Sequence, residues 1–103
     1  MLKIGSMCLA GVMALTAAPL VAATDAEADC TYQADVVSAV RQARIDGVKE
    51  RAVPQAVQGA SPTWPEKYNA VVPLVAPWVY EMKMREVRAN DLGAAWKEMC
   101  LAR

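Results

Sequence analysis

Few side chains in this sequence are of the types that usually carry catalytic chemistry. It has three cysteines, Cys8, Cys30 and Cys100, and no histidine. Without histidine, neither a Ser-His-Asp triad nor a Cys-His pair can be built, and most zinc, copper and haem sites are excluded. A glycine-rich phosphate loop and a Cys-x-x-Cys pair are also missing. We therefore expect no catalytic residue, no cofactor and no metal site, and we expect that the protein is not an enzyme.

Carboxylates are the remaining candidates for acid–base chemistry. Asp25, Glu27 and Asp29 alternate along one short stretch. Carboxylates suit the positive end of a helix dipole, so we interpret these three as the solvated start of a helix. Calcium would need more oxygen ligands in a defined loop. An enzyme that uses carboxylates alone is the alternative, and it would need a deep pocket with two converging acids.

Residues 1–23 have the order of a secretory signal peptide. One positive charge, Lys3, precedes an uncharged apolar run, which is followed by Pro19 and by small residues up to Ala23. This order predicts export with cleavage after Ala23, which leaves residues 24–103 as one small periplasmic or secreted domain. The apolar run is shorter than the roughly 20 residues of a spanning helix, so we expect membrane contact only before cleavage. An uncleaved membrane anchor is the alternative.

Cys30 and Cys100 are the two cysteines that follow this segment. An exported protein folds in an oxidising compartment, so we expect these two residues to form a disulfide. The bond would close a loop of about 70 residues and stabilise the domain by about 4 kcal/mol. Free or intermolecular cysteines are the alternative.

The domain is expected to be organised around a helix over residues 30–48. Gly47 suits the left-handed position that ends many helices, and Val48 could then fold back on Ala43. The apolar residues of this stretch recur at steps of three and four and would share one helical face: Tyr32, Val36, Ala39, Val40 and Ala43.

Two shorter helices are predicted near the middle and at the end of the domain. Residues 49–59 predict a helix with Pro54 in its first turn, since an interior proline would cost about 3 kcal/mol. Asn90 or Asp91 can cap a last helix, and its inward residues would be Leu92, Ala95, Trp96, Met99 and Cys100. The predicted fold is therefore all-α, a small bundle of three to four short helices stapled by one disulfide.

Residues 64–81 are harder to assign because they contain Pro73 and Pro77. The apolar stripe keeps its helical phase across both prolines, which favours one bent helix that starts after a Thr63 cap. The alternative is a helix that ends near residue 72, followed by a second one that starts at Pro77. A strand over residues 71–75 is disfavoured by the same prolines.

One partner-binding surface is predicted beside these prolines. By helical phase, Trp78 points away from the apolar stripe and would lie exposed near Tyr80. Met82 and Met84 could extend this patch, because methionine suits adaptable contact surfaces. Exposed apolar patches usually mark partner sites. We therefore predict a partner-binding patch formed by Trp78, Tyr80, Met82 and Met84.

The layout of the exported chain resembles a loose group of small exported bacterial helical proteins of uncharacterised function. The shared features are a cysteine that opens a helix, an Arg-x-x-Gly at its end, a later Val-Tyr and a closing cysteine, here Cys30, Arg44 to Gly47, Val79-Tyr80 and Cys100. Its size, export signal and cysteine count are also similar to those of small helical acid-stress chaperones of the periplasm. The resemblance implies an exported helical domain.

Charge gives no sign of a nucleic-acid partner. The 11 basic and 11 acidic side chains leave a formal net charge of +0, and no basic patch stands out. We expect a small exported protein of the cell envelope that binds another envelope macromolecule or a copy of itself. A periplasmic acid-stress or chaperone-like protein is the alternative function.

Overall fold

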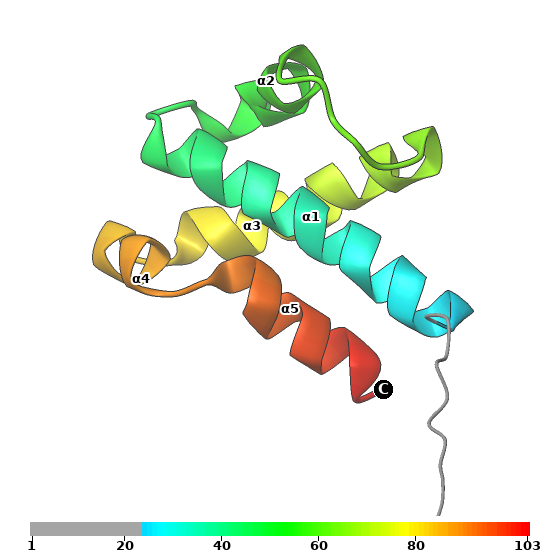
Figure 1. Cartoon of the computed structure of the whole chain (residues 1–103). Helices are drawn as coiled ribbons and strands as arrows, with labels where there is room; N and C mark the ends of the chain where they lie inside the picture. The colour runs from blue at the N-terminus through cyan, green and yellow to red at the C-terminus, as the bar shows by residue number, and fades with distance from the viewer. Residues whose placement is uncertain (1–23) are drawn as a thin grey trace, which may run out of the picture.

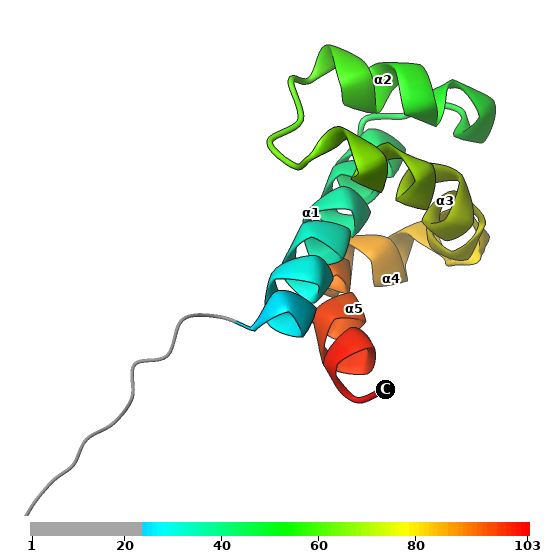
Figure 2. The same cartoon turned by 90° about the vertical axis from the view of Figure 1, so that its right-hand side faces the viewer.

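The computed structural model describes residues 24–103, which form an all-helical domain without strands over that range (Figures 1 and 2). The all-α prediction is confirmed, although five α-helices take the place of the expected three to four. The predicted signal peptide and its cleavage site lie outside the described residues. In chain order the elements are α1 (Asp25–Ile45), the 3-10 helix η1 (Glu50–Ala52), α2 (Val53–Gly59), the 3-10 helix η2 (Glu66–Val71), α3 (Val72–Glu81), α4 (Met84–Ala89) and α5 (Leu92–Leu101).

Helix α1 begins earlier than the periodicity predicted, at Asp25 rather than Cys30. Thr24 caps it, because the Thr24 hydroxyl oxygen accepts a hydrogen bond from the Glu27 amide at 3.0 Å. The carboxylates of Asp25 and Glu27 occupy the first turn, where they suit the helix dipole.

Helix α1 ends just before Gly47, as the sequence predicted. Gly47 has a left-handed backbone with φ of 85°. The Val48 amide donates to the Ala43 carbonyl at 3.0 Å, and the Gly47 amide donates to the Arg44 carbonyl at 3.1 Å. These two bonds form a Schellman ending, which turns the chain sharply towards η1.

Helix α1 passes through the middle of the domain and has neighbours on several sides (Figures 1 and 2). Its buried face is therefore broader than the predicted stripe, and it also includes Ala34 and Val37, whereas Tyr32 and Ala39 are only half-buried. The core around it is rich in valine. The largest fully buried side chains are Val36, Val37, Val40, Val53, Val72, Val75, Val79 and Val87.

The short helix predicted over residues 49–59 forms as η1 followed by α2. Pro54 lies in the first turn of α2, as predicted, where its missing amide hydrogen costs no helical bond. Val53 and Val57 are the buried residues of α2, and this helix packs against α1.

Residues 66–81 stay helical across both prolines but change helix type. The 3-10 helix η2 continues directly into α3, in which Pro73 lies in the first turn and Pro77 lies inside. A proline fits the first turn of an α-helix because the amides there have no partner within the helix. The change falls between residues 71 and 72, so neither the single bent helix nor the division at Pro77 describes the segment fully.

The start of this segment also differs from the prediction, because Thr63 does not cap it. Pro65 occupies the position before η2, and it makes no side-chain cap. The Trp64 indole donates instead to the Asn69 side-chain oxygen at 2.9 Å, and the Gln58 side-chain nitrogen donates to the same oxygen at 2.8 Å. The Gln58 bond ties η2 to α2, and the Trp64 bond ties η2 to the residues that precede it.

Helix α5 runs antiparallel to the first half of α1 (Figures 1 and 2). Asp91, one of the two predicted caps, caps it and accepts a hydrogen bond from the Ala94 amide at 3.0 Å. The disulfide between Cys30 and Cys100 is confirmed, with Cα atoms 5.7 Å apart. Through this bond the last helix is fixed to the start of the first.

The buried face of α5 differs from the predicted one. Leu92 and Cys100 are buried as expected, but Ala95 and Met99 are exposed, so their inward placement was wrong. Gly93 is buried in their place. Because α5 meets α1 through its small residue Gly93, the helix is turned so that the side bearing Met99 faces outward.

Candidate functional site

The four residues of the predicted patch are each half-buried and pack partly against the core: Trp78, Tyr80, Met82 and Met84. Trp78 and Tyr80 are two residues apart on α3, which is about 200° around a helix. Their side chains therefore leave α3 in nearly opposite directions. Met82 directly follows α3, and Met84 is the first residue of α4 (Met84–Ala89). The role of the four residues in binding stays a prediction.

Tyr80 takes part in a network of internal contacts. Its hydroxyl donates to the Val48 carbonyl at 2.6 Å, and the Arg44 guanidinium lies 5.1 Å from the centre of its ring. Arg44 also donates to the Met82 carbonyl at 2.7 Å. Burial raises the pKa of Tyr80, and the positive charge of Arg44 opposes that rise. These contacts join the end of α3 to the end of α1, so we assign Tyr80 a structural role.

Trp78 belongs to a row of apolar side chains that crosses from α3 to α5. Leu74 precedes it by one turn on the same face of α3 and is 74% exposed. The Trp78 ring packs against Trp96 of α5, with ring centres 5.5 Å apart. Met99 follows Trp96 on α5 by three residues and is 50% exposed. We name Leu74, Trp78, Trp96 and Met99 the apolar band.

The exposed side of α3 is apolar because of the sequence of this helix. Residues 70–80 contain no charged side chain. As α3 they bury one side against the rest of the domain, and the other side, with Pro73, Leu74 and Pro77, remains exposed. A helix that is apolar all round is normally buried all round. The exposed side of α3 is therefore a candidate interface.

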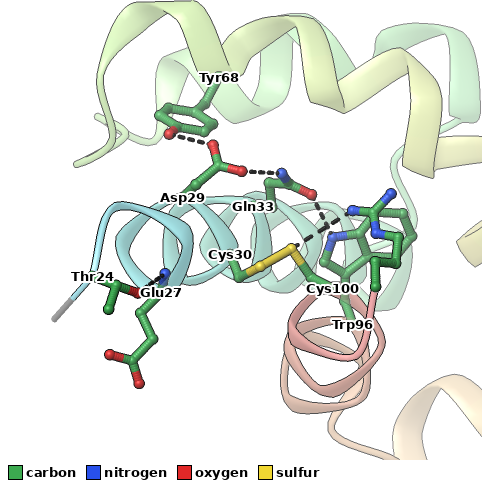
Figure 3. The surroundings of a disulfide bond; sticks show 9 residues. Thr24, Glu27, Asp29, Cys30, Gln33, Tyr68, Trp96 and Cys100 are labelled. Carbon is green, nitrogen blue, oxygen red and sulfur yellow. Dashed lines mark hydrogen bonds between the residues drawn. A yellow bond between two sulfur atoms is a disulfide. The ribbon is translucent and has the colours of Figure 1, made fainter.

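Trp96 is held in position by a chain of hydrogen bonds beside the disulfide (Figure 3). Its indole donates to the Gln33 side-chain oxygen at 2.9 Å, and the Gln33 side-chain nitrogen donates to the Asp29 carboxylate at 2.8 Å. The Tyr68 hydroxyl donates to the other oxygen of Asp29 at 2.6 Å. This hydrogen bond, together with burial, raises the pKa of Tyr68 to about 12. The chain connects α5, α1 and η2, and it orients the Trp96 ring within the apolar band.

A small hollow lies at the α5 end of the apolar band. It has a volume of about 240 Å³ and is lined by Trp96, Met99, Cys100 and Arg103. The Arg103 guanidinium lies 3.7 Å from the Cys100 sulfur. One positive charge therefore stands beside the exposed Met99.

A wider groove lies between η1, α2 and α3. It has a volume of about 690 Å³, and its lining combines three charged residues with three apolar ones. The three apolar residues come from α2 and α3. The lining residues are Lys49, Glu50, Arg51, Pro54, Pro73 and Ala76.

Sequence reasoning found part of the apolar band and missed the rest. Trp78 was placed in a partner-binding patch, but Leu74 was not singled out, and Met99 was assigned to the interior. The signal for Leu74 was the uncharged run over residues 70–80, which is too apolar for a helix with one solvated side. No comparable signal existed for Met99, because its exposure depends on how α5 is turned against α1.

Residues 24–103 hold no group of three or more possible metal ligands. None of the helices described over that range is long and apolar enough to cross a membrane. No protein family, curated protein or solved structure matches this chain. The likeness to small exported bacterial proteins therefore stays a prediction.

Proposed function

We propose that this chain is a small non-enzymatic binding protein whose partner covers the apolar band. The observation that carries the proposal is Leu74, which is 74% exposed on a helix that has no charged side chain before its last residue, Glu81. Contiguous exposed apolar surface on a soluble domain usually marks a site of interaction. Two tryptophans lie next to Leu74 along the band, and tryptophan is enriched among the residues that dominate the binding energy of interfaces.

The proposed place of action is the cell envelope or the outside of the cell. Residues 1–23 have the order of an export signal, and disulfides such as Cys30–Cys100 persist in oxidising compartments. The partner would then be another exported macromolecule.

The groove beside α3 supports a role in binding more than one in catalysis. It is lined by a single carboxylate, Glu50, which stands between the cations Lys49 and Arg51. Acid–base catalysis by carboxylates alone would need two acids that converge on one pocket.

The proposal is tested by crosslinking in the cells that normally make the protein. A photoreactive residue replaces Ala95, which is exposed and lies one turn before Met99 on α5. We expect crosslinks to one dominant protein partner, and we expect Leu74→Asp to remove them. Leu101→Asp is the matched control, because Leu101 is 45% exposed but does not belong to the apolar band. The proposal would be contradicted if the Leu74→Asp variant and the protein that keeps Leu74 gave equal amounts of crosslinked product.

A periplasmic acid-stress chaperone is the second candidate, and the exposed apolar band favours it, because exposed apolar surface usually marks a site of interaction. Strong acid would then partly unfold the domain and expose more apolar surface. Helicity and the fluorescence of a dye that binds apolar surface test this between neutral pH and about pH 2. Unchanged values across that range would remove the candidate.

A further inference from the structure

We propose that Cys100 is the cysteine through which this domain exchanges disulfides with an external oxidant, and that Cys30 closes the Cys30–Cys100 bond in a second step. The inference does not depend on what covers the apolar band. It follows from the hollow beside Cys100, from the cation that contacts the Cys100 sulfur and from the carboxylates that stand near Cys30.

The hollow gives a reagent access to Cys100. Its volume is about 240 Å³, and Trp96, Met99 and Arg103 line it together with Cys100. About 15 Å³ is enough to hold a water molecule, so the hollow has room for a sulfur atom and the carbon atoms attached to it. Both cysteines are otherwise buried, with 4% of Cys30 and 9% of Cys100 exposed. Because Cys30 does not line the hollow, an incoming sulfur meets Cys100 first.

Positive charges surround the Cys100 sulfur. The Arg103 guanidinium donates to this sulfur at 3.7 Å, and Lys97 lies three residues before Cys100 on the same side of α5. Nearby cations stabilise a thiolate, which is the nucleophile in disulfide exchange. The carboxyl end of the α5 dipole opposes this with only about half an elementary charge. Glu98 is about 200° around α5 from Cys100 and points to another side.

Cys30 stands among carboxylates instead. Glu27 precedes it by three residues on α1, and Asp29 is its neighbour in sequence. Figure 3 shows the Asp29 carboxylate turned towards Tyr68, with which it shares a hydrogen bond. Negative charge near a sulfur disfavours its thiolate. Cys30 is therefore the weaker nucleophile of the pair, and it suits a second step in which the sulfur that it attacks is already held beside it.

The reaction then proceeds in two exchanges, each of which forms one disulfide bond and breaks another. In the reduced domain the Cys100 thiolate attacks one sulfur of the oxidant's disulfide, and the other oxidant sulfur leaves as a thiolate. Cys30 releases its proton to water and attacks the Cys100 sulfur, so that the Cys30–Cys100 bond forms and the first oxidant sulfur leaves as a second thiolate. The domain loses two electrons, and these reduce the oxidant's disulfide to two thiols.

The charges around the two sulfurs select an oxidant that is negatively charged beside its disulfide. Arg103 and Lys97 attract such a molecule to Cys100. Oxidised glutathione has this chemistry, because each half of the molecule carries a net negative charge at neutral pH. Cystamine is a disulfide of opposite charge and serves as the comparison.

The first test maps where glutathione attaches during oxidation. The protein is expressed with its own first 23 residues, with Cys8→Ser so that two cysteines remain. It is reduced and mixed with oxidised glutathione at low salt, samples are quenched in acid, and peptide mass spectrometry locates the mixed disulfide. We expect Cys100 to carry about fivefold more glutathione than Cys30 at early times, the effect of one charge pair about 4 Å apart in water. With cystamine this excess should shrink. Glutathione shared equally, or found mainly on Cys30, overturns the inference.

The second test runs the reaction backwards on the oxidised protein, so the reduced domain need not stay folded. By the same route in reverse, a thiolate attacks Cys100 and Cys30 leaves. Reduced glutathione should therefore break the disulfide about fivefold more slowly in Arg103→Gln than in the unmodified protein, whereas the cationic thiol cysteamine should react at least as fast. Arg103→Lys should keep most of the rate with glutathione.

Arg85→Gln is the matched control for the second test. Arg85 is exposed on α4, which is held to α1 at Arg41, far along the helix from Cys30. Its replacement should change neither rate. If Arg103→Gln slows both thiols equally, Arg103 stabilises Cys100 as the leaving group and Cys30 is the sulfur attacked, which overturns the inference. Unchanged rates with both thiols would also overturn it.

Discussion

Gly93 lies where α5 meets the backbone of α1, so its replacement by alanine tests the packing of the two helices. A methyl group at this position would contact the Ser38 hydroxyl and would lie 2.9 Å from the Ala34 carbonyl oxygen. The hydroxyl can rotate away, but the carbonyl belongs to the α1 backbone, so the two helices must move apart. Overpacking of this kind costs about 1–3 kcal/mol, and the better helix propensity of alanine returns at most about 1 kcal/mol. We expect Gly93→Ala to lower the free energy of unfolding by about 1–2 kcal/mol.

Urea unfolding of the oxidised protein, followed by circular dichroism, measures this change. Gly59→Ala is the matched control, since Gly59 ends α2 and a methyl group there would have no neighbour within 4 Å. It should leave stability unchanged or raise it by up to about 1 kcal/mol. In a Ser38→Ala background, part of the cost at Gly93 should disappear, because one of the two contacts is gone. If Gly93→Ala proved as stable as Gly59→Ala, α5 would not pack on α1 as described.

Three further predictions concern stability. The pKa of Tyr68 is raised to about 12 by its hydrogen bond to Asp29 and by burial, so the folded state keeps this proton longer than the unfolded state. Stability that is complete below about pH 10 should therefore fall as the pH rises towards about 12, and urea midpoints at alkaline pH should fall less steeply for Tyr68→Phe. Replacing both Cys30 and Cys100 by serine should cost about 4 kcal/mol in the same assay, and a much smaller loss would mean that the unfolded chain stays compact. Gly47→Ala should cost at least about 1 kcal/mol because its φ is 85°, and an unchanged midpoint would show that another ending of α1 is equally stable.

The ends of the helices were predictable where one side chain or one glycine decides them. Gly47 ends α1 and Asp91 caps α5, because a left-handed backbone favours glycine and an orphan amide needs an acceptor. The disulfide was predictable because two cysteines follow the predicted export signal. The two helix ends depend on residues that are close in sequence, and the disulfide depends on the number of cysteines.

Features that depend on contacts between distant helices were not predictable. The segment over residues 66–81 changes from 3-10 to α-helix between residues 71 and 72, and Asn69 in its 3-10 part accepts hydrogen bonds from Trp64 and from Gln58 of α2. The outward position of Met99 follows from the way Gly93 lets α5 approach α1. A periodicity shows that a helix has an apolar side, but it does not show how far a neighbour turns that side away from the core.

The exposure of α3 is a consequence of how few elements this domain has. A domain of about 80 residues buries only roughly 60–65% of the surface that its unfolded chain exposes. Helix α1 is enclosed by α2, α3 and α5, but α3 packs on the domain through one side. Polar residues on the other side would have made α3 an ordinary surface helix at little cost to stability, whereas residues 70–80 contain no charge. An apolar exposed side gives the isolated domain no stability and makes it prone to associate. This exposed apolar side is explained if a partner covers it in the functional protein. Leu74→Asp tests this explanation, because a domain without a partner would lose neither binding nor stability by the change.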